Sequence, residues 1–227
     1  DYCVDEAVQI FGGTGYSEEF PVASMYRDSR INRIFEGTNE INPMLAVGQV
    51  KKRAMKGQLD VMGPAMKIQE ELMEIPDFGD EGDGSIFYWE HKAINQAKKA
   101  ILMTAGAAAQ KFMLELEKQQ EILLAIADMA IEVLAAESAI LRTEKSVQLH
   151  SQEEMDLQIK LTKVYLSDVL ERVFIAGKHA LTAFAEDDEL RMMMLGLKRF
   201  TKYEPINTIG LRKEVAQAVV KENAYCF

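Results

Sequence analysis

From residue 85 almost to its end, the chain repeats apolar residues at the spacing of an α-helix, with no strand-like alternation. Apolar residues at i, i+3, i+4 and i+7 share one face of a helix, whereas a half-buried strand alternates with a period of two. The pattern predicts three long helices, a shorter fourth and a last amphipathic segment, marked by residues 94–105, 123–141, 159–184, 190–197 and 211–223. Helices with one apolar face each bury those faces in an antiparallel bundle, so the predicted fold class is all-α.

Shorter helices are predicted in the first 69 residues. An apolar stripe over residues 4–11 stops at Gly12 and Gly13, where a helix is expected to end and a loop to follow. Pro21 suits the first turn of the next helix. A further helix follows a break at residues 36–38. Because residue 1 is Asp and a helix is already under way there, we expect the chain to be the C-terminal piece of a longer protein.

Residues 70–84 form the predicted domain boundary. This stretch holds seven acidic residues, three glycines, one proline and no basic residue. Such a composition buries too little apolar surface to offset the entropy of ordering. We therefore expect an acidic linker between a domain at 1–69 and a helical bundle domain at 85–227.

The net charge of the chain limits the kinds of partner that it can bind. With 26 Lys and Arg against 36 Asp and Glu, the formal charge is −10, which argues against non-specific binding to nucleic acid. No apolar stretch approaches the roughly 20 residues that span a bilayer. Cys3 and Cys226 lie at opposite ends of the sequence, and reduced thiols in the cytosol or an equivalent compartment are the simpler interpretation.

Few residues look equipped for chemistry on their own. The three histidines stand singly on predicted helices, so no metal site is expected. The GGTG segment at residues 12–15 could let a backbone approach a phosphate, but it lacks the full GxGxxG pattern and follows a helix, so a plain helix stop is the simpler interpretation. Glu36, between Phe35 and Gly37, could be a partly desolvated base, although most glutamates near helix ends are solvated.

Two segments together carry a resemblance. Residues 9–16, QIFGGTGY, and 26–41, YRDSRINRIFEGTNEI, resemble the C-terminal signature of the acyl-CoA dehydrogenases. The rest of the chain resembles, more weakly, the extra helical domain of the very-long-chain branch and its large bacterial relatives. The resemblance implies the end of the acyl-CoA dehydrogenase C-terminal helical bundle, followed by an appended antiparallel bundle.

The resemblance also implies a reaction, the α,β-dehydrogenation of fatty acyl-CoA thioesters in β-oxidation. Glu36 would be the catalytic base that removes the α proton, while hydride goes to FAD. Gly37 would lie beside the substrate thioester. The residues implied in binding FAD are Gln9, Gly12, Gly13, Thr38, Asn39 and Glu40. The first three would approach its adenosine diphosphate part across a homodimer interface, and electron-transfer flavoprotein would be the usual acceptor.

The match has limits and alternatives. Asn42 and Pro43 stand where the family commonly has an Arg. We expect the chain alone to bind FAD poorly and to be inactive, and the whole protein to work in a bacterial cytoplasm or a mitochondrial matrix. A helical interaction, assembly or membrane-docking module without activity is the alternative. Its acidic charge disfavours a membrane, and Glu36 argues against a homologue that has lost its activity.

Overall fold

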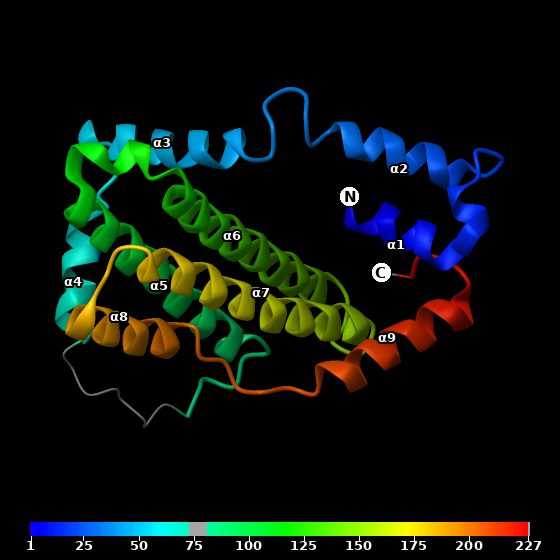
Figure 1. Ribbon diagram of the computed structural model, residues 1–227. Coiled ribbons are helices and arrows are strands. Elements are labelled where there is room, and N and C mark those ends of the chain that lie inside the picture. Colours follow the sequence, from blue (N-terminus) through cyan, green and yellow to red (C-terminus); the bar gives the residue numbers. More distant parts are fainter. Residues whose placement is uncertain (73–80, 227) are drawn as a thin grey trace. The chain divides into compact units, whose positions relative to one another are not determined.

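The computed structural model describes residues 1–72 and 81–226. The chain divides into two compact units, Asp1–Gln49 and Val50–Phe227. Within the described residues, helices are the only regular secondary structure of each unit (Figure 1). The all-α prediction is therefore confirmed.

The first unit contains α1 (Tyr2–Phe11), the short 3₁₀ helix η1 (Gly12–Tyr16), α2 (Pro21–Ile31) and the start of α3 (Ile41–Met55). As expected, α1 stops at Gly12, whose φ of 62° is a left-handed conformation that glycine adopts without strain. Pro21 opens α2. The loop expected after residue 12 begins instead as η1, in which the Thr14 hydroxyl donates to the carbonyl of Phe11 at 2.7 Å.

The first unit has very little core. Among its residues, all of which are described, only Val22 and Gly15 are buried. Many large apolar side chains are exposed instead: Tyr2, Ile10, Phe11, Tyr16, Phe20, Met25, Ile31, Ile34, Phe35, Ile41 and Leu45. Since burial of apolar surface is the main driving force of folding, this unit is poorly stabilised by its own contacts.

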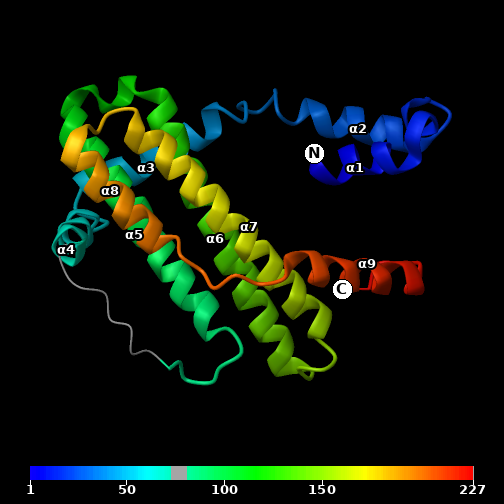
Figure 2. The same ribbon diagram turned by 60° about the horizontal axis from the view of Figure 1, so that its bottom comes forward.

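The second unit is a helical bundle. Its elements are α4 (Met62–Leu72), α5 (Tyr88–Phe112), η2 (Met113–Lys118), α6 (Gln120–Leu149), α7 (Asp156–Thr182), α8 (Asp187–Phe200) and α9 (Thr208–Glu222). The long helices α5, α6 and α7 lie side by side, as Figures 1 and 2 both show. Arg172 of α7 pairs with Glu132 of α6 at 2.9 Å, and Thr143 and Thr162 meet 2.7 Å apart. These pairs fix the two helices as antiparallel neighbours.

The core of the bundle follows a heptad-like seam. On α6 the buried positions 122, 126, 129, 133, 136, 140 and 143 alternate steps of four and three as in coiled coils, and Ala127 is buried beside this series. Leu134 and Leu141 belong to the apolar stripe that marks residues 123–141 in the sequence, but they do not face the core, because their exposures are 65% and 53%. Met129 and Ile140 are buried in the seam instead.

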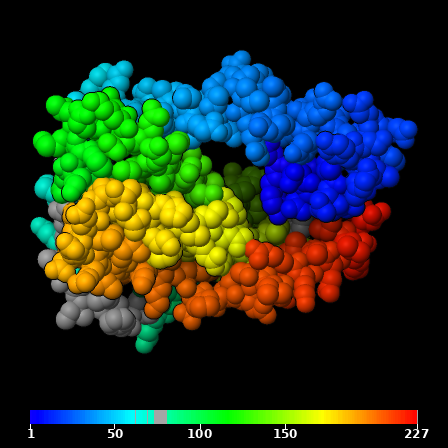
Figure 3. All heavy atoms as spheres, in the orientation of Figure 1, coloured from blue at the N-terminus to red at the C-terminus, as the bar shows by residue number. Residues whose placement is uncertain are grey.

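Small residues allow α4 and α8 to pack closely on the bundle. A Cβ atom added at Gly196 of α8 would lie 2.4 Å from the Cδ2 atom of Leu72. At Gly106, in the small-residue run of α5, it would lie 3.5 Å from the Cβ atom of Ala65, an ordinary contact. In the space-filling view, α7 (yellow) and α8 (orange) form one continuous surface (Figure 3).

The predicted linker falls largely outside the described residues. Residues 70–72 are the end of α4, where the Glu71 carboxylate accepts hydrogen bonds from the Lys99 ammonium of α5 at 2.7 and 2.8 Å. Residues 73–80 are outside the described part. The division at residues 70–84 stays a prediction, while the compact units part between Gln49 and Val50.

Candidate functional site

Residues 32–40 form the loop that connects α2 to α3 and carries the predicted base. The Asn39 amide donates to the carbonyl of Arg33 at 3.2 Å, which closes the loop near its start. The Thr38 carbonyl accepts from the amides of Ile41 and Asn42, at 3.0 Å each, and so connects the loop to the start of α3. The hydroxyl oxygen of Thr38 accepts from the Ile41 amide at 3.3 Å, so Thr38 also stabilises the beginning of α3.

Glu36 lies at the sharpest point of this loop. Its φ is 58° and that of Gly37 is 90°, so two successive residues have left-handed backbone conformations. Such a conformation is uncommon for a glutamate. The Glu36 side chain is exposed.

The first unit by itself does not give Glu36 the partial desolvation that we expect. Its apolar neighbours Ile34 and Phe35 are themselves 55% and 49% exposed. They do not form a covering wall, and adjacency in sequence alone does not bury a side chain. A dry environment for Glu36 would therefore need groups outside the first unit.

Gly37 packs against the side chain of Asn42. The Asn42 side-chain amide nitrogen donates to the Gly37 carbonyl at 2.8 Å. A Cβ atom added at Gly37 would lie 2.4 Å from the Asn42 Oδ1 atom. Asn42 appeared in the sequence only as a departure from the family pattern. The available signal was its class, because Asn side chains near helix starts commonly bond to nearby backbone groups.

Thr38 and Glu40 interact with each other. The Thr38 hydroxyl donates to the Glu40 carboxylate, and this hydrogen bond is the main reason why the pKa of Glu40 is lowered. A backbone hydrogen bond and the nearby Arg30 and Arg33 lower that pKa further. Glu40 is thus held as an anion at the surface, beside the exposed Asn39.

The other predicted cofactor residues lie at the far end of α1. Asp1, at the start of this helix, accepts a hydrogen bond from Ser29 at 3.2 Å and pairs with Arg33, at the base of the Glu36 loop. Gly12 and Gly13 follow its last turn, and a ten-residue helix is about 15 Å long. The structure thus arranges the predicted residues in two clusters, Gln9 with the glycines and residues 36–40.

The glycine cluster leaves space for a ligand. Gln9, Gly12 and Gly13 are exposed. A Cβ atom added at either glycine would have no other atom within 4 Å. A flat or phosphorylated group could therefore approach this backbone closely, as the proposed FAD contact requires.

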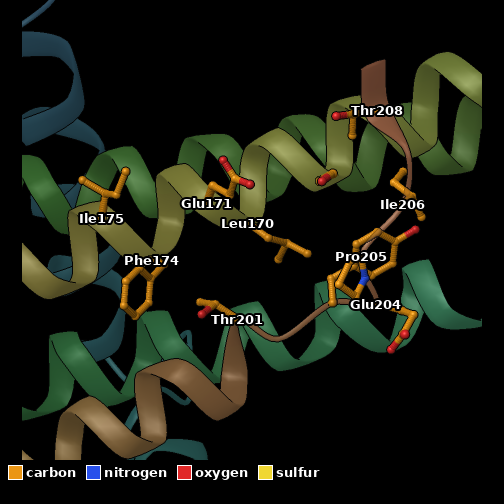
Figure 4. A pocket seen from close by; sticks show the side chains of 11 residues that line it. Leu170, Glu171, Phe174, Ile175, Thr201, Glu204, Pro205, Ile206 and Thr208 are labelled. Carbon is orange, nitrogen blue, oxygen red and sulfur yellow. The ribbon is translucent and has the colours of Figure 1, made fainter. Parts of the chain in front are cut away.

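The bundle contains a cavity of about 450 Å³, between α7 and the segment that leads into α9 (Figure 4). Leu170, Phe174 and Pro205 contribute apolar surface, and Glu171 and Glu204 are the charged residues of its lining. No Lys, Arg or His is among the residues that line it. This cavity is therefore poorly suited to the phosphates of a coenzyme A thioester.

Within residues 1–72 and 81–226, no group of three or more His, Cys, Asp or Glu side chains could hold a metal ion. His91 is paired with Glu144 across α5 and α6 at 2.7 Å. Within the same ranges, no helix is both long and apolar enough to cross a membrane.

Comparisons with known proteins match both units. Residues 1–50 and residues 96–199 match two family models, each described as an acyl-CoA dehydrogenase C-terminal domain. Both segments are similar to acyl-CoA dehydrogenases. The first range includes the Glu36 loop and the glycine cluster, and the second covers most of the bundle.

The individual relatives that match this chain include acyl-CoA dehydrogenases. A probable acyl-CoA dehydrogenase of Bacillus subtilis is 40% identical over 225 residues, which are 99% of this chain and 38% of the relative. The crystal structure of an acyl-CoA dehydrogenase from Bacillus anthracis, complexed with FAD, matches all of this chain and 38% of its own, with a TM-score of 0.94 and 41% identity. The chain thus spans little more than a third of these relatives.

A third relative matches only a short part of the chain. The short-chain specific acyl-CoA dehydrogenase of Megasphaera elsdenii is 63% identical over 43 residues, which are 19% of this chain and 11% of the relative. This match is thus much shorter than that to the Bacillus subtilis relative, although its identity is higher.

Proposed function

We propose that this chain is the C-terminal part of a flavin-dependent acyl-CoA dehydrogenase that acts on fatty acyl-CoA thioesters. The observation that carries the proposal is Glu36, an exposed carboxylate on a left-handed turn, within a segment that matches the family model. The predicted FAD-binding residues Thr38, Asn39 and Glu40 follow it directly. The substrate and the reaction are those of the family, because the chain spans 38% of its two long relatives.

In this proposal Glu36 is the catalytic base. Its carboxylate takes the α proton of the thioester, and the adjacent Gly37, which has no side chain, leaves room for the thioester group. FAD, when bound, accepts the hydride that leaves the β carbon, so that a double bond forms between the α and β carbons. Gln9, Gly12 and Gly13 approach the adenosine diphosphate part of FAD across a dimer interface, and Thr38, Asn39 and Glu40 touch the FAD of the same or the partner subunit.

We also propose a branch of the family, a homodimeric assembly and an electron acceptor for the whole protein. The 225-residue match to the Bacillus subtilis relative, against 43 residues for the short-chain enzyme, favours the very-long-chain or large bacterial type with an extra helical domain. A homodimer would place the glycine cluster beside the FAD of the second subunit. Electron-transfer flavoprotein would take the electrons, in a bacterial cytoplasm or a mitochondrial matrix.

An anaerobic visible spectrum of the full-length flavoprotein tests the role of Glu36. Saturated acyl-CoA substrates of 4, 8 and 16 carbons are added to the wild type, to Glu36→Gln and to the control Glu19→Gln, which changes another exposed carboxylate of the first unit. We expect at least one substrate to bleach the flavin in the wild type and the control but not in Glu36→Gln. Equal bleaching in all three would place the base elsewhere, and no bleaching at all would favour the interaction or assembly module.

The 227-residue chain alone gives a second test. It lacks most of the length of its relatives, and the Glu36 carboxylate is exposed in it. We expect it to retain little FAD after gel filtration and to show no acyl-CoA-dependent reduction of added FAD. Flavin-linked turnover by this chain would contradict the proposal that its site is incomplete.

A further inference from the structure

We propose that Asn42 is a positioning residue that holds the turn bearing Glu36 in its left-handed conformation. The inference rests on the proposed function, because it concerns the orientation of the base in that reaction. Asn42 lies in the first turn of α3, six residues after Glu36. It would act through the backbone of Gly37 and would not touch the substrate.

The contact between Asn42 and Gly37 has two parts. The amide nitrogen of Asn42 donates to the Gly37 carbonyl at 2.8 Å, which is good hydrogen-bond geometry. The other side of the amide lies so close to the α-carbon of Gly37 that an added Cβ would be 2.4 Å from Oδ1. The side chain thus fixes both the carbonyl direction and the position of the residue next to the base.

The turn depends on this contact because little else holds its centre. The other hydrogen bonds of the loop join Asn39 to Arg33 and Thr38 to the start of α3. Within the described residues, the bond from Asn42 is the one hydrogen bond made by the backbone of Glu36 or Gly37. A left-handed backbone is disfavoured for Glu36, whereas glycine adopts it without strain, so without this bond the turn would sample other conformations.

Misplacement of a base affects rate more than binding. A shift of about 1 Å in a reacting group can reduce a rate about 100-fold, because proton transfer requires a narrow range of distances and angles. The Gly37 carbonyl is at the surface and would be hydrated when its donor is removed. The fold should therefore be little affected by the loss.

The test uses the full-length flavoprotein with Asn42→Ala, which removes the donor, and Asn42→Gln, which retains an amide on a longer side chain. Asn32→Ala is the matched control, because the Asn32 amide also donates to an earlier carbonyl, that of Asp28 at 3.3 Å, at the end of α2. The measurements are the rate of flavin bleaching by the acyl-CoA that is active on the wild type, KM, FAD content and Tm. The bleaching rate is also measured with the α-deuterated form of that acyl-CoA.

We expect Asn42→Ala to bleach about 10- to 100-fold more slowly, with KM, FAD content and Tm unchanged and with a deuterium isotope effect at least as large as in the wild type. Asn42→Gln should recover much of the rate, and Asn32→Ala should match the wild type. A wild-type rate in Asn42→Ala, or losses of rate, FAD and Tm together without recovery in Asn42→Gln, would overturn the inference. Glu36→Gln, run in parallel, separates the outcomes, because bleaching by that variant would refute the proposed function itself.

Discussion

A buried carboxylate connects the last part of the bundle to its core, and its removal gives a quantitative prediction. Glu90, in the first turn of α5, is 3% exposed and accepts a hydrogen bond from the Tyr203 hydroxyl at 2.7 Å. Its nearest cation is Lys163 of α7, with 3.6 Å between Nζ and Oε1. Tyr203 lies in the segment between α8 and α9, so the hydrogen bond ties that segment to α5.

The change is Tyr203→Phe, which leaves the ring and removes only the donor. Hydrogen bonds to charged groups contribute about 1.5 to 3 kcal/mol. Because Lys163 still pairs with Glu90 in the variant, we expect the loss of stability to lie in the lower part of this range, at about 2 kcal/mol. For a chain of this size each kcal/mol shifts Tm by about 2 to 4 °C, so the expected decrease is about 4 to 8 °C. Thermal unfolding of the 227-residue chain, followed by circular dichroism at 222 nm, measures it.

A double-mutant cycle isolates the cause. In the Glu90→Gln background the buried acceptor is neutral, so Tyr203→Phe should destabilise the chain by about half as much as in the wild type. Equal losses in both backgrounds would show that Tyr203 does not act through the Glu90 charge. That result would refute the reasoning even if Tyr203→Phe were destabilising.

The same contact predicts a pH dependence. Burial, followed by the hydrogen bond to Glu90 and its charge, raises the pKa of Tyr203 well above its usual value. A raised tyrosine pKa contributes stability that is fully present below the unfolded-state pKa of about 10 and is lost as the pH rises further. Above pH 10 the wild type should therefore lose stability more steeply than Tyr203→Phe, and parallel curves would contradict this origin.

Three further predictions concern packing, charge and the first unit. Gly196→Val should lower stability by about 1 to 3 kcal/mol through overpacking against α4, whereas Gly106→Ala should be neutral or stabilise by up to about 1 kcal/mol; urea unfolding measures both. Partial desolvation, followed by the charge of Glu132, raises the pKa of Asp128, so the charged form is disfavoured in the fold although the residue is exposed. Asp128→Asn should thus raise Tm at pH 7, and the gain should vanish below about pH 4. A chain of residues 50–227 should unfold at the Tm of the whole chain, whereas a loss of most of its helix signal would show that the bundle needs the first unit.

The helices of the bundle could be predicted from sequence because their apolar spacing follows the geometry of the helix itself. Which side of each helix faces the core was harder to predict. On α6, Leu134 and Leu141 belong to a plausible stripe, but the seam is set by the neighbours α5 and α7, whose positions no local pattern contains. Gly12 and Pro21 were placed correctly, because helix ends depend on local backbone preferences.

For the candidate site too, one part could be predicted from the sequence and another could not. Its residue identities came from a family resemblance, whereas its local geometry did not follow from the letters. The left-handed backbone of Glu36 and the Asn42 contact depend on how the chain turns between two helices, and the exposure of Glu36 depends on which groups are near it in space. Burial is a property of the surroundings, so sequence neighbours such as Phe35 could not determine it.

Stability and proposed chemistry are therefore carried by different parts of this chain. The first unit holds the Glu36 loop and two buried residues, and the second holds nearly all of the core. Substitutions at Glu36 or Asn42 should change flavin reduction in the full-length protein while leaving the unfolding of the bundle unchanged. Substitutions at Tyr203 or Gly196, in contrast, should lower the Tm of the chain. If Glu36→Gln lowered the Tm of the 227-residue chain by as much as Tyr203→Phe, Glu36 would have a structural role that its exposed side chain does not explain.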